Sequence, residues 1–198
     1  MVQKTIRTIG DNNSKINITG NEKTGFTLIL IISASGIFLT PVLVAKGKTK
    51  RSLKKFNLSD QIIGTYSNNG WVNKGIMKII FKLIHKITNG NNSALLLDQF
   101  PAHIDDFTIK EANKLNIKLI FIPKGKTSIF QPLDVSINGI LKEKAKKLWK
   151  QERIKYPNKI ISVKNGIKHF LAVKNEIKKD TIINSFKKSC FNEKYISV

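Results

Sequence analysis

Hydrophobic residues in the first half of the chain occur in short continuous runs. Residues 26–45 carry no charged side chain, and the small residues 33–36 divide them into two stretches rich in β-branched and aromatic side chains. A membrane-spanning helix needs about 20 apolar residues without such an interruption. The pattern therefore favours a hairpin of two strands, at about 26–34 and 37–45, over a membrane span.

The spacing of apolar residues then changes to that of a helix. Between Ile76 and Ile87 they recur every three or four positions, and lysines lie at intervals of four on the opposite side. This pattern predicts an amphipathic helix that ends at the Asn-Gly pair 89–90. The residues before it, 57–69, show no period, and only a short strand around Ile62 is predicted there.

The second half alternates short strands with helices. Continuous apolar strands connected by helices are typical of a parallel sheet that is covered on both faces, so the predicted fold class is α/β. The predicted elements are a strand that ends at Asp98, a helix near 106–115, a strand at 117–122, a long helix after Pro132, and shorter helices near 162–175 and 180–189 with Ser162 and Asp180 as N-caps.

The charge of the chain narrows the class of partner. Its 198 residues include 35 Lys and Arg against 13 Asp and Glu, a formal net charge of +22. Such an excess favours a polyanion, with nucleic acid first and an anionic membrane surface as the alternative, although a genome biased toward lysine codons would also produce it. Apolar residues make up 41% of the chain, enough for the packed core of one domain. The single cysteine, Cys190, excludes an intrachain disulfide and predicts a reducing compartment.

Two carboxylates stand where catalytic residues would be expected. Asp98 ends an apolar strand, at the edge where open α/β sheets place their sites, and Asp134 follows Gln131-Pro132 at the start of a helix. Together they predict a divalent-metal site, because Mg²⁺ prefers oxygen ligands and two-metal phosphoryl chemistry needs several carboxylates. Taken singly, Asp98 would only end its strand and Asp134 would only stabilise a helix dipole.

Basic residues flank these acids in the sequence. Each alone is an ordinary solvated side chain, but together they would hold a phosphate backbone. Gly-Lys-Thr occurs twice without the upstream glycine of a phosphate-binding loop, so that loop is excluded. Trp71 and Trp149 are expected to pack rather than to stack on bases. The candidates for nucleic-acid binding are His103, Lys124, Lys126, Lys142 and Lys146.

Short motifs along nearly the whole chain resemble those of one transposon family. They occur in the order found in the DDE superfamily endonuclease (transposase) domain of the pogo/Tigger type, a branch of the mariner-like superfamily. The matching segments are Thr19 to Lys23, Ser33 to Gly36, Pro41, Lys46 to Lys48, Asn69 to Val72, Leu97 to His103, Ile122 to Ser128, Gln131 to Asn138, and Ile182 to Phe186.

The resemblance implies an RNase H-like mixed sheet flanked by helices, and Mg²⁺- or Mn²⁺-dependent cleavage and strand transfer of DNA. Asp98 matches the second acid of the family's triad, Asp134 matches the third, and Lys142 matches a basic residue that follows the third acid. The implied partners are DNA and either a full-length transposase or a second copy of the chain, with no small-molecule substrate and no membrane. The expected location is the nucleus.

The chain departs from the family at its start. The first acid, which the family carries on an opening strand, has no counterpart upstream of Thr19, and Asp11 lies in a polar turn. We therefore expect one DDE-type domain over residues 1–198, incomplete at its N-terminus and without the first central strand, with a polar, poorly ordered lead-in at 1–24. Val2 to Ile9 is expected to form an edge strand. Exposed sheet edges need a partner, so either Met1 to Ile9 fills part of the gap or the fragment is marginally stable.

The missing acid also bears on activity. Loss of one of three carboxylates should weaken metal binding severely, so we expect little or no cleavage from this chain alone. The alternative function is that of a non-catalytic, basic nucleic-acid-binding protein, either domesticated or a relic.

Overall fold

The uncharged segment 26–45 folds as two neighbouring strands. In the computed structural model, β2 (Phe26–Ile31) and β3 (Val42–Lys46) pair antiparallel, and nearly all of their side chains are buried. Gly36 lies in the connecting turn with φ +87°, a conformation that favours glycine, and a Cβ there would collide with the Lys179 side chain. The predicted pair of strands is confirmed, although the second strand begins at Val42 rather than near residue 37. The structure describes residues 2–7, 26–98, 105–123, 125–158 and 162–189.

Two small sheets form the central layer of the molecule. One has the order β1-β2-β3-β4, in which β1 (Val2–Arg7) pairs antiparallel with β2 and β4 (Ile63–Ser67) pairs parallel with β3. The other is the parallel pair of β5 (Ser93–Asp98) and β6 (Ile117–Ile122). Both strands of this pair were expected from the apolar runs, and their predicted ends are confirmed.

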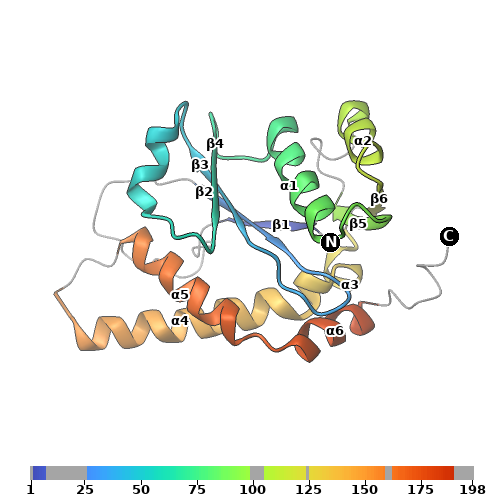
Figure 1. The fold of residues 1–198 in the computed structure, drawn as a ribbon. Helices are drawn as coiled ribbons and strands as arrows, with labels where there is room; N and C mark the ends of the chain where they lie inside the picture. The colour runs from blue at the N-terminus through green and yellow to red at the C-terminus, as the bar shows by residue number, and fades with distance from the viewer. Residues whose placement is uncertain (1, 8–25, 99–104, 124, 159–161, 190–198) are drawn as a thin grey trace.

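The strand β1 lies where the sequence leaves a gap. Its backbone pairs with β2 on one side and lies against β5 on the other, so it connects the two sheets (Figure 1). Residues 2–7 thus stand between the two sheets, within the segment from Val2 to Ile9 that the sequence offers for this role. The remainder of the predicted lead-in, including Asp11, lies outside the described residues.

Helices cover both faces of the layer (Figure 1). The lysine-striped helix α1 (Lys74–Ile87) buries its apolar face on alternate residues of β2, β3 and β5, and α2 (Asp106–Asn113) lies beside it. The opposite residues of β2 and β3 pack against the helices of the C-terminal half. Those helices are the π-helical turn η2 (Leu133–Ile137), α4 (Asn138–Lys155), α5 (Val163–Glu176) and α6 (Lys179–Lys188). The short helix α3 (Thr127–Phe130) precedes η2 and lies against it.

Three details differ from the sequence prediction. The segment after β3 contains a 3-10 helix, η1 (Lys50–Phe56), and β4 is longer than the short strand expected around Ile62, because pairing with β3 stabilises its polar residues. The helix after Pro132 begins with a π turn. Asp180 is not the N-cap of α6, since Lys178 holds that position and Asp180 lies in the first turn.

The architecture is mixed α/β, with two small sheets between layers of helices. This arrangement confirms the predicted α/β class and is consistent with an RNase H-like fold. Among the described residues, no helix is long and apolar enough to cross a membrane.

Candidate metal and nucleic-acid site

Asp98 is the last residue of β5, where three buried leucines precede it. Side chains alternate along a strand, so Asp98 shares its face with Leu96. Leu95 and Leu97 point the other way, into the core that contains the buried side of α1. The partly buried carboxylate of Asp98 therefore lies on the face of β5 that is turned away from α1.

Asp134 is the second residue of the π turn η2. Leu133 and Ile137, on either side of it, are fully buried in the core on the face of β2 that is turned away from α1. The Asp134 carboxylate is only partly buried, and its Oδ1 accepts a hydrogen bond of 2.8 Å from Asn138 Nδ2. Single π turns within helices occur frequently at functional sites.

Both acids thus lie on the same side of the central layer. Asp98 faces away from α1, and η2 packs on that side together with α3, α4 and α6 (Figure 1). Their approach to within the reach of one metal ion stays a prediction. Among the described residues, no three His, Cys, Asp or Glu side chains gather closely enough to hold an ion.

The donor atoms around Asp134 fit a metal that prefers oxygen. Two buried amides stand beside this acid in the sequence: Gln131 is 0% exposed and Asn138 is 8% exposed. Gln131 Oε1, Gln131 Nε2 and Asn138 Oδ1 have no hydrogen-bond partner among the residues that the structure describes. Buried polar atoms normally have partners, and an ion with its water would provide one. The residues present therefore fit Mg²⁺ or Mn²⁺.

Three of the four lysines predicted to bind nucleic acid lie in the described part of the chain, and all three are exposed. Lys142 and Lys146 are exposed on α4 and follow Asp134 and Asn138 at intervals of four, so the four residues extend along one side of the helix. Lys126 is exposed at the start of α3. None of these three lysines forms an ion pair with another described residue. His103 and Lys124 lie outside the described residues.

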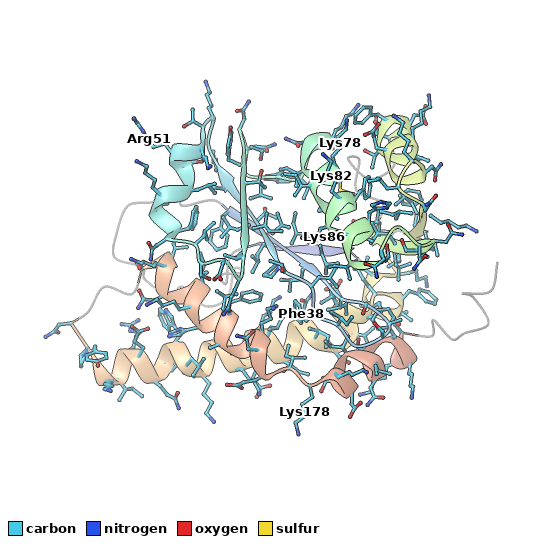
Figure 2. All side chains as sticks on the ribbon, in the orientation of Figure 1. Phe38, Arg51, Lys78, Lys82, Lys86 and Lys178 are labelled. Carbon is cyan, nitrogen blue, oxygen red and sulfur yellow. The ribbon has the colours of Figure 1, made fainter. Side chains whose placement is uncertain are left out.

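The lysines of α1 are partly neutralised instead. Lys74 Nζ lies 2.9 Å from Asp105 Oδ1, and Lys78 Nζ lies 3.0 Å from Glu111 Oε2, which ties α1 to α2. Hydrogen bonds from Lys114 and then from Lys78 lower the pKa of Glu111, and a hydrogen bond from Lys74 lowers the pKa of Asp105. Lys82 and Lys86, further along the helix (Figure 2), form no ion pair with a described residue.

The two tryptophans are less buried than packing residues would be. Trp71 is 42% exposed. Trp149 is half-buried on α4, and the Arg153 guanidinium carbon lies 5.2 Å from the centre of its ring. The predicted packing role is therefore wrong for Trp71, and Trp149 packs with only part of its side chain.

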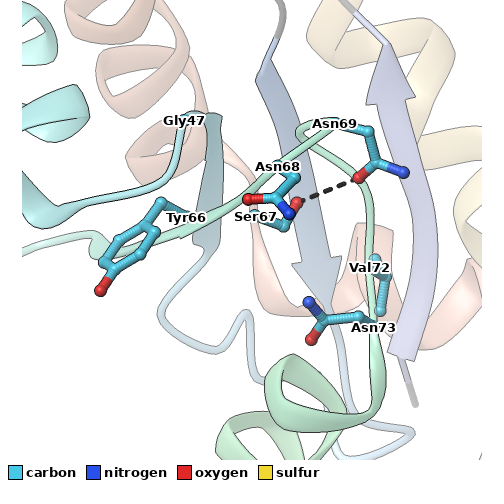
Figure 3. A pocket seen from close by; sticks show the side chains of 7 residues that line it. All are labelled: Gly47, Tyr66, Ser67, Asn68, Asn69, Val72 and Asn73. Carbon is cyan, nitrogen blue, oxygen red and sulfur yellow. Dashed lines mark hydrogen bonds between the residues drawn. The ribbon is translucent and has the colours of Figure 1, made fainter.

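A shallow cavity of about 440 Å³ lies at the carboxyl ends of β3 and β4 (Figure 3). The side-chain oxygens of two asparagines in its lining make local hydrogen bonds. Asn69 Oδ1 accepts hydrogen bonds from Ser67 Oγ at 3.3 Å and from the backbone N–H of Trp71. Asn73 Oδ1 accepts one from the backbone N–H of Ile76. Among the described residues, the lining carries no carboxylate and no histidine, and Tyr66 is its one titratable side chain. It is lined by Gly47, Tyr66, Ser67, Asn68, Asn69, Val72 and Asn73.

A comparison with known protein families identifies the family of this chain. A family model described as "DDE superfamily endonuclease" matches residues 23–186, a span that contains both Asp98 and Asp134. This chain belongs to the DDE superfamily of endonucleases. No curated protein and no solved structure matches the chain. Membership of the DDE superfamily implies a nucleic-acid substrate and, in general, the use of divalent metal ions.

Proposed function

We propose that this protein is a pogo/Tigger-like transposase domain derived from a DNA transposon, with metal-dependent phosphodiester cleavage and strand transfer as its ancestral reaction. The observation that carries the proposal is the placement of two acids within the DDE family match. One ends β5, the other lies in the π turn that opens α4, and both are on the side of the sheet away from α1.

The roles of the residues follow from their chemistry. Asp98 and Asp134 would hold Mg²⁺ or Mn²⁺, which when bound activates a water or a 3′-hydroxyl and stabilises the leaving oxygen. Lys126, Lys142 and Lys146 flank Asp134 in the chain, form no ion pair with a described residue, and would hold the phosphate backbone. If Asp98 and Asp134 alone held the ion, binding would be weak and DNA cleavage slow.

A second candidate function is nucleic-acid binding without catalysis. The net charge of +22 supports it. In this case the protein would act through its basic surface or by association with a full-length transposase or a second copy. A nuclear location follows from the proposed DNA partner in either case.

Metal and DNA titrations separate the two functions. For the transposase domain we expect Mn²⁺ binding in calorimetry that is lost in both Asp98→Asn and Asp134→Asn, with salt-sensitive DNA affinity kept in both variants. Mn²⁺ binding that does not depend on either acid would contradict the metal site and leave the non-catalytic function.

A nuclease assay on supercoiled plasmid with Mg²⁺ or Mn²⁺ tests the expected impairment. We expect little or no nicking by the wild-type protein. Efficient nicking that Asp98→Asn abolishes would show that the two acids suffice, or that a third group completes the site.

A further inference from the structure

Asn138 is the residue at which the π turn η2 ends and α4 begins. Its side chain makes one described hydrogen bond, from Nδ2 to Asp134 Oδ1 at 2.8 Å. We propose that Asn138 is a positioning residue, which holds the Asp134 carboxylate in the orientation that a metal ion requires. This inference rests on the proposed function, in which Asp134 is a metal ligand.

The chemistry of the bond fixes the orientation of both groups. An ionised carboxylate only accepts hydrogen bonds, so the NH₂ group of Asn138 must face it. The bond occupies Oδ1 of Asp134, and Oδ2 has no partner among the described residues, so it stays available to a ligand. Hydrogen-bond donors to ligating carboxylates set their orientation in metal sites, and their loss usually weakens the metal affinity 10- to 100-fold.

Burial restricts the movement of the Asn138 side chain and so keeps this hydrogen bond in place. Asn138 is 8% exposed, and its neighbour Ile137 is fully buried, so the amide has little freedom to leave Asp134. A hydrogen bond also strengthens as water is excluded from it. Asp134 itself is more exposed than Asn138, which leaves one side of its carboxylate open to an ion.

The side-chain oxygen of Asn138, Oδ1, supports a role at a metal site in addition to the hydrogen bond with Asp134. Asn138 Oδ1 is buried and has no hydrogen-bond partner within the described part of the chain. A buried acceptor without a partner is costly, and a donor such as a water bound to the metal ion would satisfy it. The amide would then contact the carboxylate through Nδ2 and the hydrated ion through Oδ1.

A second asparagine provides a matched control. Asn165 on α5 donates from Nδ2 to Glu152 Oε1 at 2.6 Å, the same bond type, and the other oxygen of Glu152 lies 3.0 Å from His169 Nε2. Both oxygens of Glu152 thus lie against side chains of α5, and the hydrogen bond from Asn165 links the two helices. Glu152 lies 18 positions beyond Asp134, near the far end of α4.

The test compares Mn²⁺ affinity, followed by the electron paramagnetic resonance signal of free Mn²⁺, in the wild-type protein, Asn138→Leu, Asn165→Leu and Asp134→Asn. We expect Asn138→Leu to weaken the affinity 10- to 100-fold, Asp134→Asn to abolish it, and Asn165→Leu to leave it within twofold. Thermal unfolding of the same samples should show a loss of stability in both leucine variants. A loss of metal affinity in Asn138→Leu alone would then not result from lower stability.

The outcomes test the proposed metal site and the proposed role of Asn138 separately. If Asp134→Asn binds Mn²⁺ as the wild type does, the proposed metal site is wrong. If Asp134→Asn loses the ion while Asn138→Leu keeps it within twofold, the metal site stands and the positioning role of Asn138 is wrong. Should Asn138→Leu not fold, Asn138→Ser replaces it, and the same limits on affinity apply to it.

Discussion

At the scale of single residues, Lys174 is held where its charge is disfavoured. Its side chain is half-buried on α5, with Nζ 5.4 Å from the centre of the Phe38 ring, and burial lowers its pKa below the usual 10.5. A lysine with a lower pKa in the folded than in the unfolded protein destabilises the fold while it is charged. That cost is full below the folded pKa and is relieved as the pH rises toward 10.5.

We therefore expect Lys174→Met to raise the melting temperature at pH 7. The advantage over the wild type should shrink as the pH approaches 10.5. Lys168→Met, at an exposed position of the same helix, is the control and should show no such trend. A Lys174→Met variant that is less stable at pH 7 would mean that the contact with Phe38 outweighs the cost of burial.

The candidate site was predictable at this scale only in part. Asp98 and Asp134 stand out in the sequence because each occupies the end of an element, where a charged side chain reaches the surface of a sheet or opens a helix. Gln131 and Asn138 do not stand out, because an amide in a helix is unremarkable until its burial is known. Their burial and the bond to Asp134 are visible only in the fold.

At the scale of elements, the helices α1 and α5 differ in how their first turns are capped. Asn73 Oδ1 accepts a hydrogen bond of 3.0 Å from the backbone of Ile76 and so satisfies a free N–H of α1. Ser162 holds the N-cap position of α5, as the sequence predicts, but its hydroxyl donates to Asn165 Oδ1 and makes no capping bond.

This difference gives a prediction for a pair of variants. Asn73→Ala should lower the free energy of unfolding by about 1 kcal/mol, the usual cost of losing a capping side chain. Ser162→Ala should cost clearly less, because no backbone N–H of α5 loses a partner. Urea denaturation measures both, and an equal loss in the two variants would contradict the capping role of Asn73.

The sequence predicted elements best where one residue pattern decides the structure. The three- and four-residue spacing of apolar side chains locates α1, and uninterrupted apolar runs locate β5 and β6. It predicted β4 and η1 poorly, because β4 (Ile63–Ser67) contains polar residues that are stable as a strand only beside β3. Such pairing depends on tertiary contacts and leaves a weak trace in the local pattern.

At the scale of the whole molecule, the positive charge is divided between two faces. Lys142 and Lys146 extend from Asp134 along α4, whereas Lys82 and Lys86 lie on α1, on the other side of the sheet layer (Figure 2). Among the described residues, neither pair is neutralised by an acid. The two pairs carry the same charge, so they can report which face binds DNA.

We expect the face with α4 to bind the duplex. The double variant Lys142→Gln, Lys146→Gln should reduce the slope of log affinity against log salt concentration by about 2, since each phosphate contact contributes about 0.9. The matched variant Lys82→Gln, Lys86→Gln should leave the slope nearly unchanged. Equal reductions, measured by fluorescence anisotropy with a labelled duplex, would indicate diffuse binding over both faces.

The sequence by itself determined the class of the fold, most of its elements, the basic character of the surface and the two acids. These depend on the spacing of apolar residues, on composition and on motifs, all of which are local or additive properties of the chain. Only the tertiary structure decided that β1 stands between β2 and β5, that both acids face away from α1, and that Asn138 contacts Asp134. Those features arise from strand pairing, from the alternation of side chains across a sheet and from burial, which bring together residues that no local pattern relates.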